Sequence, residues 1–146
     1  MKVYLDNCSF NRPFDNQVQL IIRLETEAKL FIQAKIVAGE IQLIWSYMLE
    51  YENSLNPFPE RKEMILEWKT MATETILESP KLLVNARKMF KLGLKPKDAL
   101  HLACAVEADS DFFKTTDRGI LKKTDTFEKV RIISPINFIN TWEEEK

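Results

Sequence analysis

Glycine, cysteine and histidine are scarce in this 146-residue chain, which contains three, two and one of them. With 45% hydrophobic residues and no internal repeat, the composition excludes a disordered or low-complexity protein. Cys8 and Cys104 form no CxxC pair and are too few for a disulfide scaffold, so we expect reduced thiols. The length suits a single compact domain, residues 1–146, with a core of its own.

Long apolar runs are also missing. No segment approaches the roughly 18 apolar residues that a membrane span requires. The N-terminus lacks the charged, apolar and small-residue regions of a signal peptide. We therefore expect a cytoplasmic protein with no membrane partner.

The net charge of −1 is unevenly distributed. Between Lys81 and Arg131 there are twelve basic and seven acidic residues, whereas the remainder has nine basic and fifteen acidic ones. A basic half can mark a polyanion site, but solvated helix faces give similar counts, so both interpretations stay open.

Apolar segments alternate with amphipathic ones along the chain. Strands are predicted at Val3–Leu5, at "IQLIWS" ending on Ser46, at "FFKTT" and at "VRIIS". A loop with Pro13 follows the first strand, and Asn16 with Gln19 resembles a capping box before a long helix that ends near Gly39. Further helices are predicted over 47–54, 60–75, 80–92, 96–108 and 136–146, with a short helix or turn from Arg118. This alternation predicts a parallel sheet covered by helices on both faces.

Acidic residues occur where predicted strands end. In open α/β sheets, ligands bind beyond the carboxyl ends of the strands. Asp6 and Asp117 directly follow strands, and Asp98 lies in the first turn of an apolar helix. Asp6 and Asp117 are equally consistent with turn residues, and Asp98 with a partner of the helix dipole.

The helix after Ser46 carries two glutamates, Glu50 and Glu52, which cannot both face the sheet because residues two apart point to opposite sides. Glu52 shares its side with Met48, Tyr51 and Leu55, which we expect to face inward, so we favour Glu52.

Asp6, Glu52, Asp98 and Asp117 together resemble the acidic quartet of the PIN domain family. The resemblance rests on "YLDN", on an acid six residues after the strand-ending serine, on "KDALHLACA" and on "FFKTTD", and it spans nearly the whole chain. One departure is Asn7, where Thr or Ser commonly follows the first acid.

The resemblance implies a three-layer α/β/α domain with a parallel sheet of four or five strands in the order 3-2-1-4-5. It also implies an Mg²⁺- or Mn²⁺-dependent ribonuclease. Many members are VapC-like toxins that an antitoxin partner restrains, and they often form homodimers. RNA, an antitoxin and a second copy of the chain are thus the expected partners.

Carboxylates alone suffice for such a site, since Mg²⁺ and Mn²⁺ prefer oxygen ligands and retain several waters. The ion would orient a water for in-line attack on a phosphodiester and stabilise the developing charge. We expect Asp6 and Asp98 to ligate directly, and Glu52 and Asp117 to act as ligands or through water. Thr115 or Thr116 is a candidate hydrogen-bond partner. Candidates for contacting RNA are Arg12, Lys97, Lys114, Arg118 and Lys122.

Other polar residues receive weaker roles. His101 is expected to be a buried, hydrogen-bonded residue rather than a base, because metal-assisted hydrolysis does not require one. Cys8 as a nucleophile would need a suitable histidine, which the sequence does not indicate. Asp109 and Asp111 are loop acids, and Asp111 is the better spare ligand because it is closer to its strand.

Two other functions remain as alternatives. An aspartate phosphotransfer domain also places Asp after its first strand, but it would need an adjacent acid pair or a D-x-D motif, and "LDNCS" has neither. The second is a catalytically silent PIN-like module that binds RNA or a protein partner.

Overall fold

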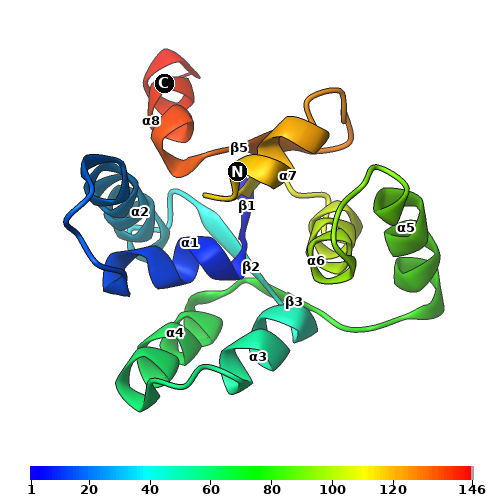
Figure 1. Ribbon diagram of the computed structural model, residues 1–146, viewed down its shortest axis with the longest axis horizontal. Helices are drawn as coiled ribbons and strands as arrows, with labels where there is room; N and C mark the ends of the chain where they lie inside the picture. The colour runs from blue at the N-terminus through cyan, green and yellow to red at the C-terminus, as the bar shows by residue number, and fades with distance from the viewer. Residues whose placement is uncertain (146) are drawn as a thin grey trace.

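A five-stranded parallel sheet forms the centre of the computed structural model, which describes residues 1–145 (Figure 1). Its order, β3-β2-β1-β4-β5, confirms the predicted 3-2-1-4-5 topology, and every neighbouring pair is parallel. The strands are β1 (Lys2–Leu5), β2 (Gln42–Ser46), β3 (Glu74–Ile76), β4 (Phe112–Lys114) and β5 (Arg131–Ile133).

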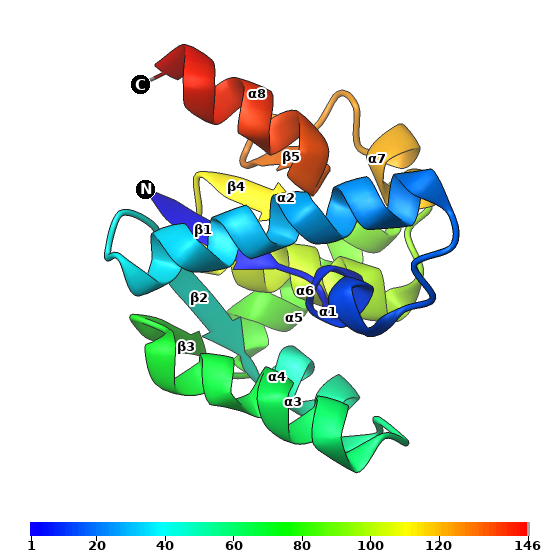
Figure 2. The same cartoon turned by 90° about the vertical axis from the view of Figure 1, so that its left-hand side faces the viewer.

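Helices cover both faces of the sheet, which gives the predicted α/β/α layers. Figures 1 and 2 show α2 and α8 on one side and α5 and α6 on the other. No helix within residues 1–145 has the length and hydropathy needed to cross a membrane. The helices are α1 (Asn7–Asn11), the 3₁₀ turn η1 (Arg12–Phe14), α2 (Leu20–Val37), α3 (Tyr47–Ser54), α4 (Pro59–Met71), α5 (Pro80–Phe90), α6 (Pro96–Glu107), α7 (Arg118–Lys123) and α8 (Pro135–Glu145).

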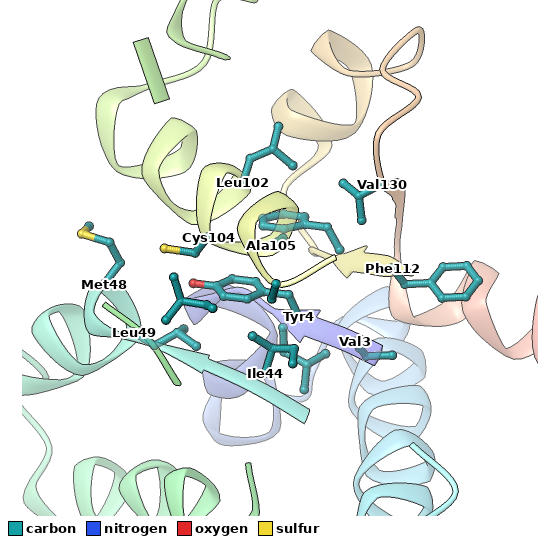
Figure 3. Close-up of a cluster of buried hydrophobic side chains, with 14 of the residues drawn as sticks. Val3, Tyr4, Ile44, Met48, Leu49, Leu102, Cys104, Ala105, Phe112 and Val130 are labelled. Carbon is teal, nitrogen blue, oxygen red and sulfur yellow. The ribbon is translucent and has the colours of Figure 1, made fainter. Parts of the chain in front are cut away.

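The core lies on both faces of the sheet, since successive strand side chains point to opposite faces. Tyr4 faces α6, and its ring stacks on Phe113 with centroids 5.5 Å apart. Figure 3 shows Tyr4 near Leu49 of α3 and Cys104 of α6. Phe112, on the opposite face, packs its ring edge against Phe138 of α8 at 5.1 Å. Burial on two faces explains why the strands are apolar without alternation.

Three local predictions were wrong, of which the first two concern residues 74–76 and the start of α2. Residues 74–76 form strand β3 instead of the end of a helix, because the chain leaves α4 and pairs with β2. Only Ile76 of this edge strand is buried, so it contains no apolar run that the sequence could display. The predicted capping box is also absent: Asn16 accepts from Val18 N, and α2 begins after Gln19, whose side chain makes no capping bond.

The segment after β1 folds into α1 and η1 rather than the predicted loop. The other helices lie close to their predicted ranges, and Gly39 and Gly93 follow α2 and α5 with φ of 79° and 93°, as expected of residues that end helices. The last position of the predicted C-terminal helix, Lys146, lies outside the described residues.

Candidate active site

Asp6 lies at the carboxyl end of β1, where it caps helix α1. Its Oδ1 accepts a 2.9 Å hydrogen bond from Ser9 N, and the residue is 4% exposed. Burial raises the pKa of the carboxyl to about 6, although hydrogen bonds from Thr115 and Ser9 oppose this rise. Asp6 is therefore a buried acid that gains from a nearby positive charge.

Glu52, rather than Glu50, contacts α6. Its Oε1 accepts from Nε2 of His101, whereas Glu50 forms a 2.7 Å ion pair with Lys69 of α4. Burial alone would raise the pKa of Glu52, but the hydrogen bond from His101 holds it below its usual value. The argument used to choose Glu52 was nevertheless wrong in part, because Tyr51 and Leu55 are 52% and 59% exposed.

Asp98 and Asp117 approach the same region from α6 and α7. Asp98 lies in the first turn of α6, and its pKa is raised by burial and then by the charge of Asp117. Asp117 caps α7 by accepting from Gly119 N at 2.8 Å and Ile120 N at 3.2 Å. One of its carboxylate oxygens is thus held by the helix terminus.

Cys8 lies where the charges of all four candidate acids act on it, although the residue itself is exposed. Desolvation, followed by the charges of Asp6, Asp117, Asp98 and Glu52, raises the pKa of its thiol to about 12. Coulombic effects of this kind require short separations. A thiol held protonated in this way is a poor nucleophile, which supports the expectation that Cys8 does not attack substrate.

A pocket of about 140 Å³ opens beside Asp98 and Asp117. Lys95 and Lys123 line it together with Gly119. Neither lysine was predicted. Lys95 directly precedes the proline that starts α6. Its place at a helix N-terminus is the sequence feature that could have identified it. The position of the Lys123 side chain depends on how α7 packs against the end of α5, since its Nζ donates to Gly93 O at 2.9 Å.

Three of the predicted RNA contacts lie on the surface. Lys97, Arg118 and Lys122 are exposed, and Lys97 Nζ lies 5.9 Å from the centroid of the Tyr51 ring. The charge of Lys97 also lowers the pKa of Glu52, which places this lysine beside the site. Its role with RNA stays a prediction.

Of the other two basic candidates, Lys114 does not fit a contact with RNA. It is fully buried on the α8 face of β4, with its ammonium over the Phe138 ring, and burial lowers its pKa. Lys114 was misjudged because its side of the strand depends on sheet register. Arg12 is partly exposed and forms ion pairs with Glu25 at 3.3 Å and Asp15 at 3.2 Å, and its role with RNA stays a prediction.

The remaining polar candidates divide between the two ends of the sheet. Thr115 and Thr116 are both buried, and Thr115 Oγ1 accepts from Asp117 N at 3.0 Å, so Thr115 links β4 to the acidic site. Asp111 lies at the opposite end, where its Oδ2 accepts from Lys2 N at 2.7 Å, and it is not a spare ligand. Asp109 is exposed in the same loop with φ of 54°.

The donor chemistry of the four acids fits Mg²⁺ or Mn²⁺, because all their side-chain donors are oxygens and their charges repel one another. Within residues 1–145, no three such side chains are arranged as a complete metal site. Asp6 and Asp117 each hold a backbone amide through Oδ1. The arrangement concentrates negative charge beside two lysines and can attract a cation and a phosphate.

The fold is similar to that of a chain in the crystal structure of VapBC2 from Rickettsia felis bound to a DNA fragment from their promoter. The TM-score is 0.56 at 14% sequence identity, over 90% of this chain and 97% of the other. At this identity the likeness shows a shared fold. No family model matches the sequence, and no curated protein matches it.

Proposed function

We propose that this protein is an Mg²⁺- or Mn²⁺-dependent ribonuclease of the PIN type that acts as the toxin of a toxin–antitoxin pair. The observation that carries the proposal is that the acids act on one another and on Cys8: the charges of Asp117 and Glu52 raise the pKa of Asp98, and all four charges raise that of Cys8. The shared fold with a chain of the VapBC2 assembly supports it. Glu52 and Asp98 make no capping hydrogen bond to their helices, so capping does not account for them.

In this proposal Asp6 and Asp98 hold the cation directly, and Glu52 and Asp117 hold it directly or through water. When bound, the cation orients a water, lowers the pKa of that water and stabilises charge on the phosphate. Asp6 must be ionised to serve as a ligand. Burial raises its pKa because the negative charge loses its water, and a bound cation would compensate this loss and favour the ionised form.

The chain's own basic residues bind and orient the RNA. Lys95 and Lys123 line the pocket beside Asp98 and Asp117, so they are placed to receive a phosphate. Lys97 and Lys122 extend positive charge over the neighbouring surface. Contacts of this kind bind the backbone without reading its sequence.

Cleavage of mixed RNA by the purified protein, with Mn²⁺ or with EDTA, tests the activity. We expect Mn²⁺-dependent cleavage that is lost in Asp98→Asn and retained in Asp125→Asn, which changes an exposed acid outside the site. Urea unfolding checks that both variants fold. RNA binding without cleavage under any metal would instead support the silent module.

The antitoxin part of the proposal has a candidate surface of its own, a groove of about 490 Å³ between α2 and α4. Its rim includes Val37, Met64 and Met71, which are 63%, 53% and 41% exposed. Lys29 lines the groove with its ammonium over aromatic rings and beside the amide oxygen of Gln33, and no carboxylate among residues 1–145 that the structure describes pairs with it. We propose that the groove receives an apolar segment of the antitoxin that carries an acidic residue.

Co-expression with the protein encoded directly upstream tests this surface. We expect that protein to co-purify with the wild type and to be lost from Met64→Glu, while Met64→Glu cleaves RNA normally. Co-purification unchanged by the substitution would exclude the groove. The expected homodimer stays a prediction, which sedimentation of the pure chain would decide.

A further inference from the structure

A buried series of polar side chains connects Glu52 to the middle of the sheet. His101 Nε2 contacts Glu52, and His101 Nδ1 lies 2.6 Å from the Tyr4 hydroxyl. The Tyr4 hydroxyl lies 2.6 Å from Ser46 Oγ. His101 is 2% exposed, and Tyr4 and Ser46 are fully buried. The four residues come from α3, α6, β1 and β2, so the series crosses from the helical layer to two central strands.

The chemistry of each group sets the direction of the hydrogen bonds. The Glu52 carboxylate only accepts, so His101 must present N–H at Nε2. A neutral imidazole then has a lone pair at Nδ1, which accepts the hydroxyl proton of Tyr4. Ser46 caps α3 by accepting from Leu49 N at 3.1 Å, and its own hydroxyl proton is directed at the Tyr4 oxygen. In this arrangement every donor meets an acceptor.

We propose that His101 is a positioning residue that holds the Glu52 carboxylate toward the other three acids, with Tyr4 and Ser46 fixing the orientation of its ring. The effect on cleavage rests on the proposed ribonuclease function, whereas the hydrogen-bond arrangement does not. His101 touches neither the 140 Å³ pocket nor an exposed surface, so its influence on RNA acts through Glu52.

The contrast with Glu50 shows what the series adds. Glu50 lies on the same helix, but its ion pair with Lys69 involves side chains that are 46% and 40% exposed. Such a pair leaves the carboxylate free to move. Glu52 is held at a buried ring whose far side is also bonded, which is how outer residues orient the ligands of metal sites. A histidine that only stabilised the core would need no hydrogen bond to a carboxylate of the candidate site.

The ring nitrogens of His101 provide the first test. His101 is the only histidine in the chain, so its ¹⁵N signals identify themselves in the metal-free protein. We expect one tautomer of the neutral ring, with the proton on Nε2 and, on Nδ1, the lone pair that accepts from the Tyr4 hydroxyl. In Glu52→Gln the signal of Nε2 should change while the signals of the backbone of α5 and α8 stay in place. A proton on Nδ1, or an equal mixture of tautomers, would overturn the proposal.

Three substitutions provide the second test. Tyr4→Phe removes one hydroxyl and keeps the ring that stacks on Phe113. His101→Leu removes the donor to Glu52, and His101→Gln supplies an amide N–H near Nε2. We expect kcat to fall about 10- to 100-fold in His101→Leu, less in Tyr4→Phe, and to recover partly in His101→Gln. The KM for RNA should not change, and Glu50→Gln should match the wild type.

The outcomes separate this proposal from the proposed function. Wild-type cleavage by Tyr4→Phe and His101→Leu, or a change confined to KM, would refute a positioning role. If the wild type cleaves no RNA, the ribonuclease proposal fails and the ring nitrogens alone decide the arrangement. If His101→Leu does not fold in a urea titration, Tyr4→Phe and His101→Gln decide the kinetic test.

Discussion

Lys29 is a buried lysine whose replacement should stabilise the protein. The residue is 1% exposed, and its Nζ lies 4.8 Å from the centroid of Phe10 and 5.5 Å from that of Trp68. Burial lowers the pKa of the ammonium from 10.5 to about 7. The folded protein therefore has to desolvate a charge that the unfolded chain keeps in water. Lys29→Met keeps the length of the side chain without the charge.

The size of the effect follows from the shift. At about 1.4 kcal/mol per pKa unit, the change from 10.5 to about 7 corresponds to about 5 kcal/mol of lost stability near pH 7. Lys29→Met also loses two cation–π contacts, which offset about 1 to 2 kcal/mol. We expect Lys29→Met to be about 3 kcal/mol more stable than the wild type at pH 7.

The pH dependence has a definite sign. Between pH 7 and 10.5 the unfolded chain binds a proton at Lys29 that the folded protein has released, so wild-type stability rises with pH in this window. Near pH 9.5 the remaining cost is about 1.4 kcal/mol, and the neutral amine makes no cation–π contact, so the gain in Lys29→Met should fall to about 1 kcal/mol. Urea unfolding at pH 7 and 9.5, with equal m-values, measures both quantities.

Lys35→Met is the matched control in the same helix. Lys35 is paired with Glu40 at 3.0 Å on the surface, so its replacement should change stability by less than about 1 kcal/mol with no added pH dependence. The reasoning would be refuted if Lys29→Met were less stable than the wild type at pH 7, or if its gain were equal at both pH values. A lysine that costs stability in the free protein also fits a groove awaiting an acidic partner.

Three further predictions concern the acidic site. The affinity for Mn²⁺ should fall as the pH drops through about 6, because Asp6 of the metal-free protein then takes up a proton that the cation must displace; an affinity that stays constant between pH 5 and 8 would contradict this. Gly119→Ala should cleave about 10-fold more slowly yet melt no lower than the wild type, since the new Cβ would lie 3.0 Å from Asp117 Oδ1 while alanine favours helix. Thr115→Val removes a hydrogen bond that lowers the pKa of Asp6, so the midpoint of the pH profile should move upward; an unmoved midpoint would count against that bond.

Much of the fold followed from local patterns. The apolar segments before Asp6 and Ser46 were confirmed as strands because a parallel sheet buries both faces and leaves no alternation to interpret. The predicted strand order also agrees, although it came from the resemblance rather than from the patterns. The edge strand β3 escaped prediction because three residues with one buried side chain carry no periodic signal.

The positions of the candidate acids were predictable and their surroundings were not. Asp6, Asp98 and Asp117 each lie at an element boundary, as expected, because sequence patterns mark such boundaries well; their role as metal ligands stays a prediction. Lys114 was placed wrongly because a strand residue's face depends on the register of its neighbours. Lys123 was missed because a short helix can orient its side chains only through packing.

The sequence by itself determined which elements form and that carboxylates follow them, since strand propensity, helix caps and charge are properties of neighbouring residues. Only the tertiary structure decided that Glu52, His101 and Tyr4 meet, because these contacts join segments far apart in the chain. Burial in the folded chain also sets the pKa values of the acids. A carboxyl group has an ordinary pKa in the sequence, and it acquires a raised one, as Asp6 does, only when the folded chain removes its water.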